Sequence, residues 1–341
     1  MYRNWVKISL ILVYMVIIAG AVVRMTGSGM GCPDWPKCFG YYIPPSERSE
    51  LEFQSNREYK EGQVIIVDET LKVAAKDFTT SENYSEGNWT NYEKHDYAIF
   101  NPLHTWVEYI NRLIGALAGL AVAIMAFLSI KKFRFRKRIT ILSFLCVFMM
   151  GFQGWLGATV VYSVLAPVKI TINMVMALVI VAVLLYLLYY SSEEKRAHLK
   201  TSLFQNILLL AAILSLVQII MGTQVRQFVD EQIRSMGYGM ESTWMNNPTL
   251  IFYIHRSFSI LVLLVNAFLW WKNRKQQLGF SKINWVIGFI LIEIITGVAM
   301  YNFHFPVLSQ PLHLVIASFL FGLQFYLLLE CFYAERKIKK L

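Results

Sequence analysis

Two histidines, His255 and His313, lie inside long apolar stretches, a few residues from one end of each. An ionisable side chain in that position is costly in a membrane unless it has a partner or a function. Two imidazoles at matched depth on separate helices are typical of sites that hold a haem iron inside a helical bundle. The alternative is that each histidine only bonds a neighbouring helix, and the matched pair favours the iron site.

Haem suits this pair better than zinc. Structural zinc takes four protein ligands and catalytic zinc usually three, and no third ligand is evident beside His255 and His313. His304 precedes the second stretch, and we expect it to cap a helix or lie at the surface.

Four arginines have the right chemistry to pair with the carboxylates of a haem. Arg226 and Arg256 belong to the same part of the chain as His255, and Arg24 and Arg112 occupy corresponding places nearer the N-terminus. For Arg24 and Arg226, extension of the side chain into the membrane interface is an equal explanation. Arg112 and Arg256 are expected to lie deeper, which favours the haem.

Glu108 is the most informative polar residue of the N-terminal part. His104, Asn111 and Arg112 lie within one helical turn of it and share its helix face. A carboxylate inside an apolar stretch is a functional candidate, and the alternative is a simple Glu108–Arg112 ion pair. Glu293 is the second such acid, and for it we expect a structural hydrogen bond.

Four cysteines complete the reactive side chains. Cys32 and Cys38 follow the first apolar stretch in a polar segment, where a disulfide or a redox dithiol is an option. Their spacing alone is a weak signal. Cys146 and Cys331 fall within apolar stretches and are expected to be packing residues.

The elements that must position these side chains are membrane-spanning helices. The 341 residues are 56% hydrophobic and 16% charged, whereas a soluble domain carries about 25% charged residues. A hydrocarbon core takes about 20 helical residues. Eight stretches reach that length, at 5–24, 105–130, 139–162, 168–190, 203–224, 249–271, 283–302 and 311–333.

The net charge of +10 comes largely from basic loops after the second, fourth, sixth and eighth stretches. This pattern follows the positive-inside rule and argues against nucleic acid as a partner. It predicts a multi-pass protein of the lipid bilayer with both termini cytoplasmic. The first stretch is too long for a signal peptide and no transit peptide precedes it, so we expect a bacterial inner membrane.

Two polar segments are expected on the outer side. The longer one, 25–101, contains alternating residues at 63–67 and predicts an ordered extracytoplasmic cap with some strand. The shorter one, 226–247, has room for a short helix.

The chain contains an internal repeat of four stretches. The matches keep the same order: Gly20-Ala-Val-Val-Arg24 with Gly222-Thr-Gln-Val-Arg226, Tyr109-Ile-Asn-Arg112 with Tyr253-Ile-His-Arg256, Gly157 with Gly297, and Asn173 with His313. Because four is even, both units have the same orientation in the membrane. We expect an all-α polytopic fold of two four-helix bundles, a unit at 1–190 with its outer loop at 25–104 and a unit at 191–341.

Several of these motifs resemble one family, the heme A synthases. The resemblance lies in Arg24-Met-Thr-Gly-Ser-Gly29, Glu108-Tyr-Ile-Asn-Arg112, Tyr253-Ile-His-Arg256 and Pro311-Leu-His313. It covers all eight stretches, and the first motif is fairly specific. The first outer loop is longer than in the family's shorter members.

The resemblance implies an enzyme that oxidises the C8 methyl of heme O to the formyl group of heme A. It implies a haem b cofactor between His255 and His313, through which electrons leave to a quinone or another acceptor. Glu108 would serve the oxidation, and Cys32 and Cys38 match the outer-loop cysteines of some members. Heme O is the implied substrate, and a heme O synthase and a terminal oxidase assembly factor are further partners to consider.

The N-terminal half departs from the family pattern. The second and fourth spans commonly carry a further histidine pair, and this sequence has Asn111 and Asn173 there. Asn binds haem iron poorly but forms good hydrogen bonds. The substrate haem either binds with weak or no protein ligation, or takes His104 as ligand, or is absent along with the activity. With Arg24 and Arg112, these residues make up the expected substrate pocket.

A membrane b-type cytochrome that exchanges electrons with quinone is the leading alternative. It explains His255 and His313 equally well but leaves Glu108 and the Arg24–Gly29 motif without a role. A transporter is a weaker alternative, because no stretch has the Gly- or Pro-broken centre expected at a transport site.

Overall fold

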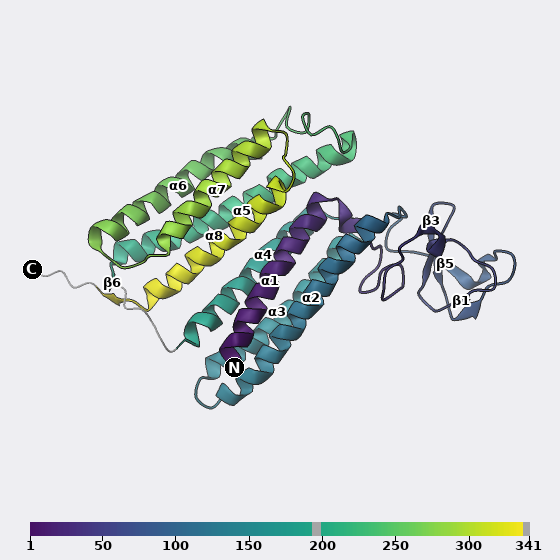
Figure 1. The fold of residues 1–341 in the computed structure, drawn as a ribbon, viewed down its shortest axis with the longest axis horizontal. Coiled ribbons are helices and arrows are strands. Elements are labelled where there is room, and N and C mark those ends of the chain that lie inside the picture. The colour runs from purple at the N-terminus through teal and green to yellow at the C-terminus, as the bar shows by residue number, and fades with distance from the viewer. Residues whose placement is uncertain (193–198, 337–341) are drawn as a thin grey trace, which may run out of the picture.

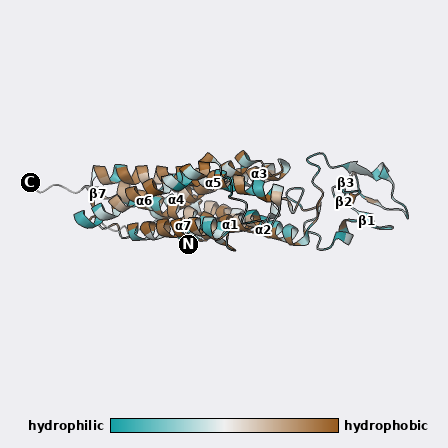
Figure 2. Ribbon diagram, turned by 90° about the horizontal axis from the view of Figure 1, so that it is seen from above, coloured by the Kyte–Doolittle hydropathy of each residue, from teal (hydrophilic) through white to brown (hydrophobic). Residues whose placement is uncertain are grey.

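The long apolar runs fold into eight helices in the computed structural model, which describes residues 1–192 and 199–336 (Figure 1). They are α1 Tyr2–Met25, α2 Pro102–Ser129, α3 Lys137–Tyr162, α4 Pro167–Tyr190, α5 Ser202–Met236, α6 Leu250–Gln276, α7 Ile283–Asn302 and α8 Ser309–Phe332. Each is long and apolar enough to cross a membrane. The predicted all-α, multi-pass membrane fold is therefore confirmed, and Figure 2 shows hydrophobic residues dominating these helices.

Helix α5 ends later than predicted from the sequence. The predicted span stopped at residue 224, but the helix continues to Met236 and takes in the first part of the expected outer loop. Two side-chain pairs spaced four residues apart support this polar extension, Arg226 with Asp230 and Gln227 with Glu231. Hydropathy detects the apolar run, whereas such pairs let a helix continue beyond it.

The eight helices form two rings of four. In one ring α1 packs against α2 and α4, and α3 closes the ring between them. In the other, α5 packs against α6 and α8, and α7 closes it in the same way. Figure 1 shows the two bundles side by side, joined where α8 meets α1 and α4 and where α4 meets α5.

The two short loops that close the rings share one backbone conformation. Val164 and Leu165, between α3 and α4, both have positive φ angles, and so do His304 and Phe305 between α7 and α8. A positive φ is uncommon for residues other than glycine. The hydrogen bonds match as well: Leu165 N–H donates to Val160 O, and Phe305 N–H donates to Met300 O. The two loops lie 140 positions apart, at 164–165 and 304–305, which is the separation of Gly157 and Gly297.

Both aromatic and polar contacts join the bundles. Tyr14 on α1 stacks on Phe319 of α8, with ring centroids 4.4 Å apart. Gly322 of α8 gives the Tyr14 hydroxyl room, because a Cβ at this position would collide with it. Thr171 of α4 and Thr223 of α5 share a hydrogen bond of 3.0 Å.

A small β-rich cap extends beyond the end of α2 (Figure 1). Its antiparallel sheet has the order β2-β3-β5, from Val64–Val67, Thr70–Ala74 and Trp89–Asn91, and β1 Glu58–Tyr59 pairs with β4 Phe78–Thr79. The strand predicted at 63–67 is thus confirmed. At the opposite end of the molecule, β6 Leu199–Lys200 pairs with β7 Glu335–Arg336. Short 3-10 turns lie at Ser28–Met30, Arg48–Leu51, Glu86–Asn88 and Ile130–Lys132.

The cap is built on the segment that follows α1. Val64, Ile66 and Leu71 of the sheet bury their side chains against Cys38 and Phe39. Val64 N–H also donates a 3.0 Å hydrogen bond to Phe39 O. The sheet therefore holds in place the short loop that lies directly over the N-terminal end of α2.

Candidate functional site

His255 of α6 and His313 of α8 face each other inside the second bundle. Their ring centroids are 6.5 Å apart and the rings are inclined by 68°. Two imidazoles that bind one metal ion from opposite sides, with each nitrogen about 2 Å from it, have centroids roughly 6 Å apart. The spacing thus fits a shared metal such as a haem iron.

Glycines on the other two helices leave space beside both rings. A Cβ at Gly222 of α5 would lie 3.2 Å from His255 Cε1, and a Cβ at Gly297 of α7 would lie 3.6 Å from His313 Cε1. Larger side chains at these positions would press on the imidazoles. Both glycines belong to the internal repeat, and the nearby imidazoles explain why a residue without a side chain stands at each position.

His313 has the partners that a metal-binding histidine usually has. Its Nδ1 lies 2.8 Å from Thr296 Oγ1 and 3.1 Å from Glu293 Oε2, both on α7. Such partners fix the ring orientation and leave the other nitrogen available for a metal. The structural hydrogen bond expected of Glu293 therefore involves a candidate ligand. In the described part of the chain, His255 Nδ1 is buried with no hydrogen-bond partner.

Arg24 and Arg226 meet between the two bundles rather than serving one bundle each. Arg24 donates from Nε and Nη2 to Asp230 Oδ2 at 2.9 and 2.8 Å, and Arg226 Nη2 lies 2.8 Å from Asp230 Oδ1. Arg226 also donates to Arg24 O at 3.0 Å. Arg24 was expected in the first-half pocket, but its side chain binds a carboxylate on α5. Arg226 Nη1 is buried and, among the residues described, unpartnered.

Two predicted pocket residues are not brought to a shared site. Arg256 is exposed, and its guanidinium lies over the rings of Phe252 and Tyr253 on its own helix. Its guanidinium thus contacts aromatic rings of its own helix, and its place beside a haem stays a prediction. His104 lies in the first turn of α2, where its backbone N–H donates to Asn101 Oδ1 at 3.2 Å.

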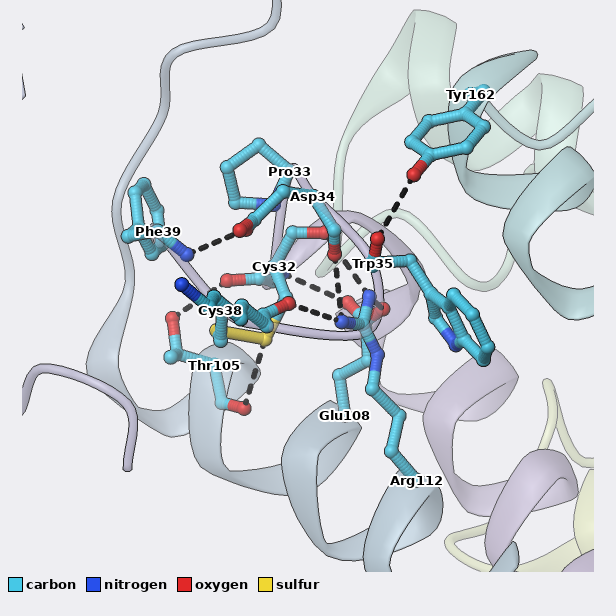
Figure 3. Close-up of polar contacts among 12 residues, drawn as sticks. Cys32, Pro33, Asp34, Trp35, Cys38, Phe39, Thr105, Glu108, Arg112 and Tyr162 are labelled. Carbon is cyan, nitrogen blue, oxygen red and sulfur yellow. Dashed lines mark hydrogen bonds and ion pairs between the residues drawn. A yellow bond between two sulfur atoms is a disulfide. The ribbon is translucent and has the colours of Figure 1, made fainter. Parts of the chain in front are cut away.

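Glu108 and Arg112 bind the disulfide loop over α2, residues 31–40 (Figure 3). Glu108 is 4% exposed, so its charge needs these partners. Its Oε1 accepts from Arg112 Nη2 at 2.5 Å, and its Oε2 accepts from Cys32 N–H at 2.9 Å. Arg112 Nη1 in turn donates to the carbonyls of Asp34 and Lys37, at 2.6 and 2.7 Å. The predicted ion pair exists, and it also anchors a loop that the sequence did not place there.

The loop is closed by a disulfide between Cys32 and Cys38. Asp34 organises the turn inside it by accepting from Phe39 N–H at 2.5 Å and from Gly40 N–H at 2.8 Å. Burial raises the pKa of the Asp34 carboxyl, although the bond from Gly40 and the charge of Arg112 oppose the rise. Asp34 was missed in the sequence because its partners are backbone groups.

Gly31 lets this loop touch the first turn of α2. A Cβ there would collide with His104 O and lie 2.7 Å from Thr105 N. Thr105 Oγ1 also donates to Gly31 O at 2.8 Å, so the loop cannot simply move away.

We predict that Gly31→Ala destabilises the disulfide loop by about 1–3 kcal/mol, the usual cost of overpacking. Faster reduction of the Cys32–Cys38 bond by a mild thiol would be the measured result. Gly87→Ala is the matched control, because its nearest neighbour would be 3.9 Å away. Equal reduction rates for the two variants would contradict this reading of Gly31.

The first bundle carries amides where the second carries histidines. Asn111 lies on α2 and Asn173 on α4, in the places of His255 and His313. Gln153 of α3 replaces Glu293, and its Nε2 donates to Asn173 O at 3.0 Å.

Several residues that bind the predicted site residues were not predicted from the sequence. For two of them, Asp230 and Thr296, the spacing along the helix could have indicated the contact. Asp230 lies four residues after Arg226, a spacing that pairs charges on a helix. Thr296 lies one turn after Glu293, so both reach His313 from one face of α7. Gln218, which donates to His255 O at 3.0 Å, had no such signal.

Comparison with known proteins agrees with the motifs. The family model described as "Cytochrome oxidase assembly protein", named COX15-CtaA, matches residues 3–325. Similar curated proteins include a protein named heme A synthase from Wolbachia sp. subsp. Brugia malayi, 25% identical over 93% of each chain. Another of that name, from Flavobacterium johnsoniae, is 23% identical over 95% of this chain and 96% of its own.

The match runs through both bundles and includes the His255–His313 pair and the Glu108–Arg112 pair. The chain therefore belongs to the COX15-CtaA family of cytochrome oxidase assembly proteins, which confirms the resemblance to heme A synthases seen in the sequence.

Proposed function

We propose that this protein is a heme A synthase, an oxidoreductase that converts a methyl group of heme O to the formyl group of heme A. The facing pair of His255 and His313 carries the proposal, together with relatives of that name that match nearly the whole chain. The four-helix unit at 191–341 is the half that keeps a resident cofactor. The unit at 1–190 is the half that receives the substrate.

The residues of the second half fit a haem b as that cofactor. His255 and His313 would be its axial ligands, with Glu293 and Thr296 orienting His313. The unpartnered Nη1 of Arg226 is a donor suited to a carboxylate of the porphyrin edge. A haem b bound there supplies one-electron redox chemistry, and we propose it as the exit for electrons towards a quinone or another acceptor.

In the first half, we propose Glu108 as the group that handles charge and protons during the oxidation. Turning a methyl into a formyl group replaces two hydrogens by an oxygen. With water as the source of that oxygen, the reaction releases four protons and four electrons, the electrons pass to the acceptor, and positive charge builds up on the carbon. A carboxylate held by Arg112 and by Cys32 N–H is fixed in position, so it stabilises that charge without reorganising. The same contacts hold Glu108 against the disulfide loop, in the half that we propose receives the substrate.

We further propose that the cap lies on the outer side of a bacterial inner membrane and that both termini are cytoplasmic. Basic residues between α2 and α3 and in the last turn of α6 support this orientation. Heme O then enters the first half from the lipid phase. A heme O synthase and an oxidase assembly factor are the partners that would supply the substrate and receive the product.

The role of Glu293 gives a direct prediction. Glu293→Gln places in the second half the amide that the first half carries at Gln153. Because His313 Nδ1 loses its carboxylate partner, we expect haem to be held about 10–100-fold less tightly. Haem transfer to apomyoglobin measures this loss, with the exposed Glu86→Gln in the cap as control. Equal transfer rates would exclude a role for Glu293 in haem binding.

The experiment for the proposed function is pigment extraction from a host that makes heme O but no heme A. Expression of this chain should produce heme A or its hydroxylated precursor. A membrane b-type cytochrome, the alternative function, would contain haem b and leave heme O unchanged. That outcome would reject the synthase.

A further inference from the structure

The first bundle repeats the glycine pattern of the His255–His313 site, but its polar side chains are different. Gly20 of α1 and Gly157 of α3 are the repeat counterparts of Gly222 and Gly297. In the second bundle those glycines adjoin the two imidazoles. At Gly20 and Gly157 a Cβ would meet no atom of the described chain within 4 Å. The space that an imidazole fills in one bundle is thus open in the other.

Three amide side chains of the first bundle have buried oxygens without protein partners. Asn111 Oδ1, Gln153 Oε1 and Asn173 Oδ1 are all buried without a hydrogen bond from any residue that the structure describes. Nearly all buried polar atoms in folded proteins are satisfied by protein or by water, so each of these three oxygens requires a donor. The amide nitrogen of Gln153 is already used, because it donates to Asn173 O.

The backbone places Asn111 and Asn173 as the second bundle places its histidines. The helix rings correspond, and the two ring-closing loops have the same positive φ angles and the same hydrogen bonds. An Asn side chain is shorter than a His side chain. Where two histidines would both reach a metal ion between them, two Asn residues on the same backbone positions are too short and leave a gap.

We propose that the first half binds its haem substrate with no side-chain ligand on the iron and with one water on each face of the iron, hydrogen-bonded to Asn111 Oδ1 on one face and to Asn173 Oδ1 on the other. This rests on the proposed function and extends it to the way in which substrate is held. Each water supplies the hydrogen-bond donor that one of these oxygens requires, and a site with buried polar acceptors is where a water is stable. An iron held through water exchanges its ligand, which suits a porphyrin that must leave after reaction.

The test uses the purified full-length protein, one added equivalent of ferric protohaem as probe, and cyanide. The added haem should give a high-spin spectrum and shift to low spin with cyanide, while the resident haem stays low-spin and unchanged. Asn111→His with Asn173→His should convert the added haem to a low-spin form that resists cyanide. Asn111→Leu with Asn173→Leu is the matched control, and it should leave the added haem high-spin.

A low-spin, cyanide-resistant added haem in the unmodified protein would overturn the proposal. Loss of that signal in His104→Ala would then identify His104 as the ligand. Failure of the protein to take up a second haem would overturn it as well. An iron bound by one histidine and one water is also high-spin and binds cyanide, so His104→Ala is made in the otherwise unmodified protein. The proposal requires that this variant leave the affinity and the spectrum of the added haem unchanged, and a change in either would overturn it. The cyanide titration and this variant decide the question even if the double histidine variant does not fold. Heme A formation in the host assay would still stand in any of these cases, which separates this inference from the proposed function.

Discussion

Protein with His313→Ala is expected to lose its tightly bound haem b and its ability to form heme A. His313 would supply one of two axial ligands, and the methyl group of Ala cannot replace an imidazole. Because removal of a partner of a ligand already weakens a metal site by about 10–100-fold, removal of the ligand should weaken it at least as much. The haem-to-protein ratio after purification, with the visible spectrum of the reduced form, measures the effect.

His304→Ala is the matched control for this prediction. His304 lies nine residues away in the exposed loop before α8, so its removal should leave haem content unchanged. A six-coordinate haem b that persists in His313→Ala would rule out the second-half site as described. Equal haem loss in both variants would point to a folding defect instead of a lost ligand.

Replacement of Glu108 by Gln should lower the rate of heme A formation by about 10²–10⁴-fold, the usual contribution of a positioned acid or base. Gln keeps an oxygen for Cys32 N–H, but it loses the charge that faces Arg112. The initial rate in the heme O host, normalised to the amount of protein, is the measurement. Heme O should accumulate while haem b in the second half stays at its normal level.

The structural alternative for Glu108 is that it only anchors the disulfide loop. Thiol labelling of Cys32 and Cys38 separates the two roles, because a loosened loop would expose the bond to reductant. An intact disulfide with a large loss of rate supports the charge-handling role. A normal rate with a normal disulfide would exclude Glu108 from the reaction, and Glu86→Gln in the cap controls for the loss of a carboxylate.

The membrane fold could be predicted from the sequence because its signal is local. About 20 consecutive apolar residues define a span wherever they occur, and all eight predicted spans coincide with helices. The polar end of α5 was not predicted, because side-chain pairs such as Arg226–Asp230 stabilise it and an apolar run does not extend over it. The strand at Val64–Val67 was visible from its alternation and β-branched residues.

The site residues could be predicted where a polar side chain lies inside an apolar stretch, as with Glu108 and Arg112, and where the repeat supplied a comparison. The alignment of the halves singled out His255, His313 and the two Asn residues before any contact was known. It did not reveal that Arg24 binds Asp230 in the other half, since that pairing depends on how the bundles meet. Asp34 was not predicted for another reason. Its partners are backbone N–H groups, which every residue except proline has, so no residue type in the sequence marks them.

The same comparison explains why two similar bundles can do different work. In the second bundle, the carboxylate of Glu293 and the hydroxyl of Thr296 both contact the imidazole of His313. In the first, the corresponding residues are Gln153, Leu156 and Asn173, none of which strengthens or supplies an iron ligand. A fixed cofactor and a substrate that must be released place opposite demands on the same scaffold.

The most direct test of this division is a haem exchange measurement on the purified protein. The protein is made with ⁵⁷Fe-labelled haem b, incubated with excess unlabelled heme O, separated from free haem and extracted. We predict that the labelled haem b remains at its original level while heme O, and the heme A formed from it, enters and leaves a second site. Replacement of the labelled haem b at the rate at which heme O binds would contradict the account, because both porphyrins would then share one exchangeable site.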